Sequence, residues 1–283
     1  IDTIYRFYAP DQDVLNLVNQ YVSHLLIDAP GLPDIELSVA KTDRRYILYK
    51  NKKPVDWCSH ISSVVPALHA TIIMNTYNKT TCLMGIHAAV VVRNNICILM
   101  PAKANSGKST ITTALIHSGF TYGADDFVLL TSEPGKIIPV PSAIGLKKGS
   151  WPVIEKYHPK IRSCPVHKRS DDKMIKYLPP SEKENCYYTS LKPINVDYIV
   201  YPHYNPEYPL SLNKINPAQS ICDLSTAGFY MHDKLDKERV RQLVDWMKIT
   251  PSYRLGFSRL ENAVTRLKSL CGSEGRERLS KFS

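Results

Sequence analysis

The amino-acid sequence predicts an α/β fold with a mixed sheet in its core, a smaller β-rich N-terminal region and C-terminal helices. Strand-like and helix-like patterns alternate over 83–133, which is typical of a strand–helix–strand unit. Short β-like runs surround a helical segment in 1–82, and two amphipathic helical patterns occupy 232–270. We therefore expect two domains, 1–82 and 83–283, in this chain of 283 residues.

The N-terminal region begins with apolar residues at helical spacing over 13–26. The pattern over 44–55 is typical of a hairpin that turns at Asn51-Lys52. The remaining elements expected here are a strand over 31–40 and a helix over 62–77. We expect this region to dock a substrate or to cap a site in the second domain.

The central segment starts with two strand patterns, over 83–92 and 96–102, separated by a polar turn at Asn94-Asn95. A helix is expected over 110–120, where a glycine ends it. The next strand, over 121–133, contains two adjacent carboxylates.

The rest of the chain is predicted to be rich in loops, since it holds most of the 20 prolines. A strand over 196–204 interrupts these loops, and helices are expected over 232–250 and 258–270. The apolar residues that share one face of the first helix are Val240, Leu243, Val244 and Met247.

A phosphate-binding loop is indicated by "PAKANSGKST" (101–110), which follows the apolar run "NICILM". The pattern G-x-x-x-x-G-K-[ST] is complete except at its first position, where Ala102 replaces glycine. In such a loop Lys108 reaches the β- and γ-phosphates, and the hydroxyl of Ser109 holds Mg²⁺. The residues expected to bind nucleotide are Ala104, Asn105, Ser106, Gly107, Lys108, Ser109 and Thr110.

Two readings of this loop compete. Gly-Lys-Ser also occurs by chance in ordinary turns, but the strand before it and the helix after it favour a nucleotide loop. Alanine at the first position is tolerated if the backbone φ angle there stays negative.

Asp125 and Asp126 follow the loop's helix and suit phosphoryl transfer. One carboxylate takes the proton of an attacking hydroxyl and the other helps to hold Mg²⁺. The competing interpretation is a solvated turn, because Gly-Ala-Asp-Asp is also good turn chemistry. The apolar run Phe127–Leu130 comes after the acids, unlike an ordinary Walker-B strand, where it comes before them.

The segment 87–130 resembles the catalytic core of the HPr kinase/phosphorylase superfamily, whose P-loop fold is of the PEP-carboxykinase-like type. His87 lies 21 residues before Lys108, and Asp125 lies 17 residues after it, in register with that core. The resemblance covers roughly 83–270, most specifically 87–130, and the N-terminal β-rich part shows a weaker likeness. Within the superfamily the chain is more similar to HPr-kinase-related proteins of peptide-modification clusters, including lasso-peptide kinases.

The resemblance implies an ATP- and Mg²⁺-dependent kinase that phosphorylates a serine of a peptide or protein, such as a lasso-peptide precursor. It implies that Lys108, Ser109 and Thr110 bind phosphates and metal, and that Asp125 is the base. It implies further that Asp126 supports the metal or the base, that His87 faces the site and that Lys147, or Lys148, neutralises the γ-phosphate. The sequence departs from the family where His203 replaces an arginine. Two alternatives stay open: a small-molecule kinase, acting for example on free serine, and a nucleotide-binding regulator without turnover.

Composition constrains the partners. The net charge of +10 is spread along the chain without a zinc-finger or RNP-like motif, so phosphate or an acidic peptide fits better than nucleic acid. Seven dispersed cysteines without a C-x-x-C pair predict reduced thiols in the cytoplasm. No apolar run is long enough to span a membrane, and no signal peptide is evident at the start. A homo-oligomer remains open.

Overall fold

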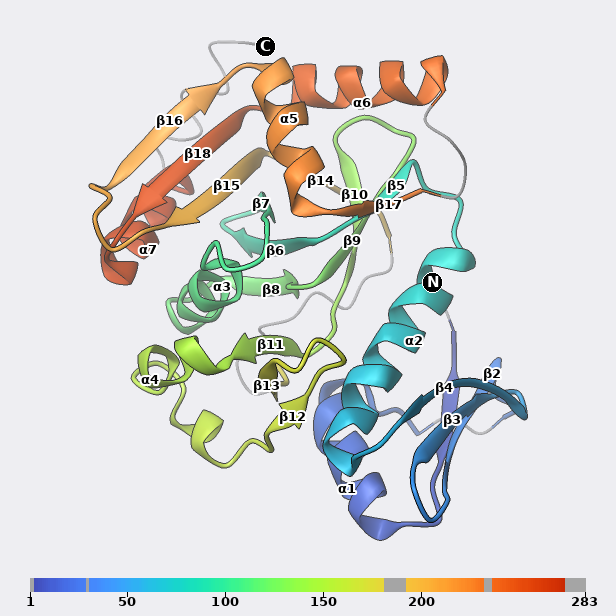
Figure 1. The fold of residues 1–283 in the computed structure, drawn as a ribbon. Coiled ribbons are helices and arrows are strands. Elements are labelled where there is room, and N and C mark those ends of the chain that lie inside the picture. Colours follow the sequence, from blue (N-terminus) through green and yellow to red (C-terminus); the bar gives the residue numbers. More distant parts are fainter. Residues whose placement is uncertain (1–2, 29–30, 181–191, 232–235, 273–283) are drawn as a thin grey trace. The chain divides into compact units, whose positions relative to one another are not determined.

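The computed structural model describes residues 3–28, 31–180, 192–231 and 236–272 of a mixed α/β chain (Figure 1). The chain divides into two units. The first comprises Ile1–Thr80 with Ser142–Ser181, and the second comprises Thr81–Pro141 with Glu182–Ser283. The expected second domain, 83–283, therefore does not hold together as one body, because 142–181 groups with the N-terminal residues instead.

The first unit contains a four-stranded sheet in the order β1-β2-β3-β4. Its strands are β1 (Tyr5–Tyr8), β2 (Ile35–Lys41), β3 (Tyr46–Lys50) and β4 (Lys53–Cys58), and its helices are α1 (Gln12–Val22) and α2 (Val64–Asn78). The predicted hairpin is confirmed: Asn51 and Lys52 both have positive φ angles, of 47° and 65°, which suit a tight turn between twisted strands.

The segment 142–180 forms a second small sheet in this unit, where only loops were expected. Its strands, in the order β11-β13-β12, are β11 (Ile144–Lys147), β12 (His167–Lys168) and β13 (Met174–Leu178). Short helical turns lie between them: η3 (Lys148–Ser150), α4 (Trp151–Ile154) and η4 (Pro159–Arg162). Ile175 and Tyr177 are buried in the same apolar cluster as Val14 and Leu37, which explains why distant parts of the sequence form one unit.

The second unit contains two larger sheets, of orders β16-β18-β15-β7-β6-β8 and β14-β10-β9-β5-β17. The strands of the first are β6 (Ala88–Arg93), β7 (Ile96–Pro101), β8 (Thr121–Ala124), β15 (Tyr198–Tyr204), β16 (Ser211–Ile215) and β18 (Ser252–Phe257). Those of the second are β5 (Met84–Ile86), β9 (Phe127–Leu130), β10 (Lys136–Val140), β14 (Ile194–Asn195) and β17 (Phe229–Tyr230). Strands β7, β15 and β18 are mutually parallel, whereas the second sheet is antiparallel.

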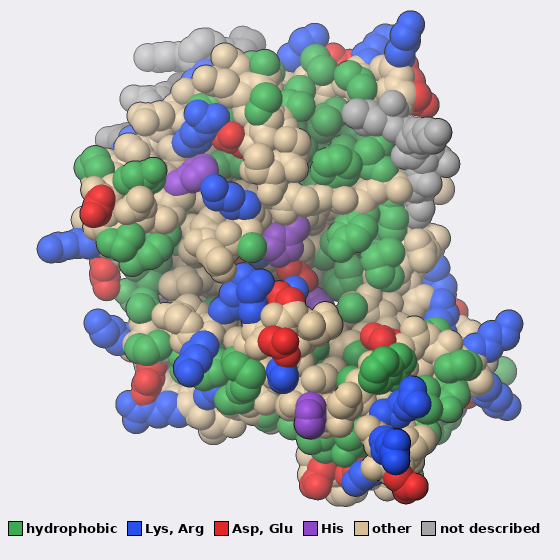
Figure 2. Space-filling model, viewed as in Figure 1, with side chains coloured by type: hydrophobic (Ala, Val, Ile, Leu, Met, Phe, Trp, Pro, Cys, Tyr) green, Lys and Arg blue, Asp and Glu red, His purple; other side chains and the backbone are tan. Residues whose placement is uncertain are grey.

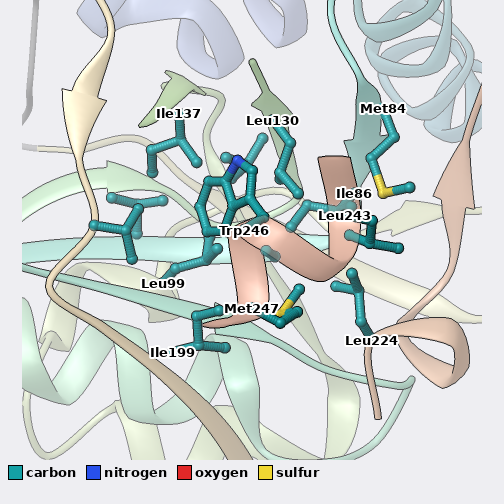
Figure 3. Packing of buried hydrophobic residues seen from close by; sticks show 14 of the residues in the cluster. Met84, Ile86, Leu99, Leu130, Ile137, Ile199, Leu224, Leu243, Trp246 and Met247 are labelled. Carbon is teal, nitrogen blue, oxygen red and sulfur yellow. The ribbon is translucent and has the colours of Figure 1, made fainter. Parts of the chain in front are cut away.

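The helices α3 (Lys108–His117), α5 (Pro217–Ala227) and α7 (Leu260–Leu270) pack on the six-stranded sheet, and α6 (Lys237–Ile249) packs on α5 (Figure 1). Helix α3 contacts α7, and α5 contacts α6. The core lies around Trp246, which is fully buried among residues from both sheets, including Leu99, Leu130 and Ile137 (Figure 3). In α6 the buried face is formed by Leu243, Trp246 and Met247, so the expected face is correct in part but Val240 is exposed.

Two expected strands are each broken in the middle. The segment 83–92 divides at His87 into β5 and β6, and 121–133 divides at Asp125-Asp126 into β8 and β9. Strand β5 pairs with β9 in one sheet, and β6 pairs with β8 in the other. Both segments therefore pass from one sheet to the other at neighbouring positions. These breaks place a histidine and two carboxylates side by side.

The described helices include none that is long and apolar enough to cross a membrane.

Candidate functional site

The phosphate loop connects the buried strand β7 to helix α3. Gly107 precedes the helix with a φ angle of 86°, a left-handed conformation that glycine adopts without strain. A Cβ atom there would lie 3.0 Å from Cβ of Tyr204 and 3.3 Å from Cζ of Phe257. Backbone conformation and close packing therefore both require glycine at this position.

Ala102 fits the first position of the loop. It is absent from the described residues with positive φ angles, so the condition for tolerating alanine is met. Its amide donates a hydrogen bond to the carbonyl oxygen of His87, at 3.4 Å. The loop's start is thus held against the break between β5 and β6.

Lys108 and Asp125 form a buried ion pair. Nζ of Lys108 lies 3.1 Å from Oδ1 of Asp125, and the two side chains are only 5% and 2% exposed. Burial raises the pKa of the Asp125 carboxyl, and the charge of Lys108 and a hydrogen bond from Ser109 oppose that rise. Asp125 therefore lies within the protein as a partner of the loop lysine, and the solvated-turn interpretation is wrong for this residue.

His87 and Asp126 form a second, more open pair. Nε2 of His87 lies 2.7 Å from Oδ1 of Asp126, and the side chains are 34% and 38% exposed. Nδ1 of His87 lies 3.1 Å from the carbonyl oxygen of Ala102, which can only accept, so Nδ1 carries a proton. The 2.7 Å contact brings Nε2 within hydrogen-bond distance of the Asp126 carboxylate, at a position that solvent reaches.

The two neighbouring acids consequently have different surroundings. Asp125 meets Lys108 in the interior, whereas Asp126 meets His87 at the surface. The resemblance implies Asp125 as the base, and of the two carboxylates Asp126 is the one more exposed to solvent. The sequence offered no signal for this distinction, because both residues are aspartates in one short segment.

The loop carries a hydroxyl suited to a phosphate group. Ser106 is 6% exposed, and its Oγ has no hydrogen-bond partner among the described residues. A buried hydroxyl without a partner is costly, and a phosphate oxygen would accept its hydrogen bond. Together with Lys108 and the N-terminus of α3, this donor fits the phosphates of a nucleotide.

The same end of α3 offers oxygen ligands for Mg²⁺. The hydroxyl of Ser109 hydrogen-bonds Asp125, so a hydroxyl and a carboxylate lie together there. In the described part of the chain no three His, Cys, Asp or Glu side chains gather into a metal site. Mg²⁺ in nucleotide sites takes one or two protein oxygens and completes its shell with phosphates and water, so the donor set fits that ion.

The other two expected phosphate ligands lie in different places. His203 lies on β15, where burial lowers its pKa; the Asp223 carboxylate opposes this effect and Lys103 and Arg254 add to it. Lys147 belongs to β11 of the first unit. The structure therefore brings His203, but not Lys147, into one unit with the loop.

Arg254 and Asp223 were missed by the sequence analysis. The Arg254 guanidinium donates to both carboxylate oxygens of Asp223, at 2.6 and 2.9 Å. Their positions on β18 and α5 form no motif, so only the register of β18 beside β15 brings them near His203.

The charged side chains do not form one basic surface on the face shown in Figure 2. Lys and Arg side chains are spread there among acidic, hydrophobic and uncharged ones. The net charge of +10 therefore does not appear on this face as a continuous stripe of the kind that tracks a nucleic-acid backbone.

No family model matches the chain, and no curated protein matches it. Among solved structures it is similar to the Hpr(Ser) kinase/phosphatase from Coxiella burnetii, with 14% sequence identity and a TM-score of 0.34. That match covers 70% of this chain and 97% of the other. A likeness at this TM-score and identity assigns the chain neither a family nor an activity.

Proposed function

We propose that this protein is an ATP-dependent kinase that transfers the γ-phosphoryl group to a serine hydroxyl of a peptide or protein. The observation that carries this proposal is the junction of three elements: the phosphate loop, the buried Lys108–Asp125 pair and the open His87–Asp126 pair. A binding protein needs the first two. The third offers a proton acceptor that nucleotide binding alone does not require.

The roles of the side chains follow from their surroundings. Lys108 exchanges its contact with Asp125 for the β- and γ-phosphates, and the amides of the loop together with Ser106 Oγ hold the remaining phosphate oxygens. Asp126 accepts the proton of the attacking hydroxyl. His87 contacts the same carboxylate through Nε2 and so fixes its orientation.

Mg²⁺, when bound, neutralises charge on the transferring phosphoryl group. Ser109 and a carboxylate of the Asp125-Asp126 pair would hold it. Their hydroxyl and carboxylate oxygens are ligands of the type that Mg²⁺ prefers.

The acceptor is proposed as a serine of a peptide, such as a ribosomal precursor peptide of the lasso type, on the sequence resemblance over 83–270 alone. Docking of that peptide by the first unit stays a prediction, as do a cytoplasmic location and a possible homo-oligomer.

Release of ADP from MgATP tests the proposal. Wild-type protein is mixed with a randomised peptide library containing a fixed serine, with free serine, or with neither. Faster ADP release with the library alone supports a peptide kinase, whereas equal stimulation by free serine contradicts it. If nucleotide stabilises the protein but ADP is released under none of these conditions, the protein is a nucleotide-binding regulator and not a kinase.

A further inference from the structure

The phosphate loop is supported on one side by two aromatic residues at the ends of parallel strands. Tyr204 is the last residue of β15 and Phe257 is the last residue of β18, and the register places them opposite each other. Their rings are 5.7 Å apart between centroids. Since Ile199 of β15 lies opposite Leu99 of β7, both strands extend beyond the level at which β7 ends in the loop.

Tyr204 is joined to the loop through its backbone. Its amide donates a hydrogen bond to the carbonyl oxygen of Ser106, at 3.1 Å, and its Cβ packs on Gly107. Phe257 is buried behind it, but Tyr204 itself is 48% exposed. An aromatic ring that borders a phosphate loop and leaves half its surface to solvent is not needed for the core.

The position of the charged groups gives a bound nucleotide a direction. His87 lies where β5 joins β6, and Asp125 and Asp126 lie where β8 joins β9. In the order of the six-stranded sheet, β6 and β8 are on the opposite side of β7 from β15. The terminal phosphate must face these groups for transfer to occur, so the nucleoside end points the opposite way. Ligands of open α/β sheets lie outside the carboxyl ends of parallel strands, and here those ends carry Tyr204 and Phe257.

We infer that Tyr204, backed by Phe257, is the stacking platform for the nucleobase of the phosphoryl donor. This inference rests on the proposed function, because it needs a nucleotide in the loop. Stacking of a base on an aromatic ring contributes affinity and tolerates different bases, since every base presents a π-face. The platform should therefore raise the affinity for a nucleotide but not for an inorganic polyphosphate, which has no base.

The variant Tyr204→Ala tests this assignment cleanly. It retains the Cβ that packs on Gly107 and the amide that binds Ser106, and it removes only the ring. Tyr204→Phe keeps the ring without its hydroxyl. Tyr8→Ala, in the first unit, removes an equally exposed tyrosine (47%) as a matched control.

Binding of ATP and of inorganic tripolyphosphate, each with Mg²⁺, is measured by calorimetry for all four proteins. We expect Tyr204→Ala to weaken ATP binding about tenfold and to leave tripolyphosphate binding within about twofold of wild type. Tyr204→Phe and Tyr8→Ala should bind both ligands as wild type does. Quenching of a 2-aminopurine nucleoside triphosphate, which reports stacking directly, should be lost in Tyr204→Ala and kept in Tyr204→Phe.

Three results would overturn the inference. An equal loss for both ligands would make Tyr204 a support of the loop, and unchanged ATP binding would remove it from the site. In both cases wild type still binds nucleotide, so the proposed kinase stands. Binding of neither ligand by wild type would instead contradict the proposed function, and the platform with it.

Discussion

The two sides of the phosphate loop differ in chemistry. Toward β6 and β8 the loop meets charged pairs, one buried and one open, whereas toward β15 and β18 it meets aromatic rings. Charged groups act on the terminal phosphate and on the proton of the acceptor, while rings act on a neutral base. Under the proposed function, this contrast gives the loop a nucleoside end and a reaction end, and each end makes separate predictions.

Replacing Lys108 should have the largest effect. Lys108→Met removes the cation for the phosphates, so we expect ATP binding to weaken at least about a hundredfold. It also leaves Asp125 buried without its partner, which should lower the free energy of unfolding by about 3–5 kcal/mol near neutral pH.

This loss of stability should depend on pH. Burial already raises the pKa of Asp125 in the folded state, and without Lys108 the largest opposing effect is gone. The folded variant then binds a proton more readily than the unfolded chain, so its deficit should shrink as the pH falls. Urea denaturation at pH 8 and pH 5 measures this. An equal deficit at both values would contradict the buried pair, and the double variant Lys108→Met/Asp125→Asn should regain stability without regaining ATP binding.

His87→Gln should disturb the reaction end alone. Since His87 is proposed to orient the Asp126 carboxylate that it contacts, phosphoryl transfer is expected to slow about ten- to a hundredfold while ATP affinity stays within about threefold. Transfer rates are compared with calorimetric affinities. His60→Gln, at an exposed histidine of the first unit, is the control and should match wild type. Loss of ATP binding in His87→Gln would mean that the histidine supports the loop.

Gly107→Ala should affect both ends to a moderate degree. The left-handed backbone and the 3.0 Å approach to Tyr204 predict a loss of about 1–2 kcal/mol in unfolding free energy and about tenfold in ATP affinity. Gly149→Ala is the matched control, because nothing lies within 4 Å of its added Cβ. A Gly107→Ala protein as stable as Gly149→Ala would show that the loop is less constrained than its geometry implies.

Ser106→Ala should give the smallest and most selective change. Removing a buried hydroxyl without a partner should leave stability unchanged or raise it by up to about 1 kcal/mol, yet weaken ATP binding about fivefold. Ser220 is buried too, but it hydrogen-bonds Tyr201 and Ser252, so Ser220→Ala should be destabilising. Thermal denaturation and calorimetry separate the two serines. Destabilisation of Ser106→Ala would mean that its hydroxyl has a structural partner.

The elements that the sequence predicts well are those with a local signal. The helices α2 and α3, the hairpin at Asn51-Lys52 and the strand–loop–helix order around Lys108 follow from periodicity and turn chemistry. For the segment 142–180 the sequence predicts loops, because its prolines are typical loop signals. Its strands are stabilised by burial of Ile175 and Tyr177 against distant residues, which no local pattern reveals.

The sequence predicted that Lys108, His87, Asp125 and Asp126 lie near one another, which the ion pairs confirm, but not how they pair. Lys147, predicted for the same site, belongs to the other unit. The phosphate-loop motif identified Lys108. The spacing of His87 and Asp125 from Lys108, which matches that of the resembled family, indicated that the three residues lie near one another. Which aspartate is buried depends on where two strands leave one sheet for another, and that follows from the pairing of β5 with β9 and β6 with β8. The aromatic platform escaped notice because Tyr204 and Phe257 meet only through parallel strand pairing.

The most direct test of the central claim compares Asp126→Asn with wild type in transfer of label from [γ-³²P]ATP to a randomised peptide library with a fixed serine. The same library with alanine in that position is the control. The account predicts label on the serine library alone, a loss of at least about a hundredfold in Asp126→Asn, and ATP affinity within about threefold of wild type. Transfer by Asp126→Asn at the wild-type rate, or equal labelling of the alanine library, would contradict it.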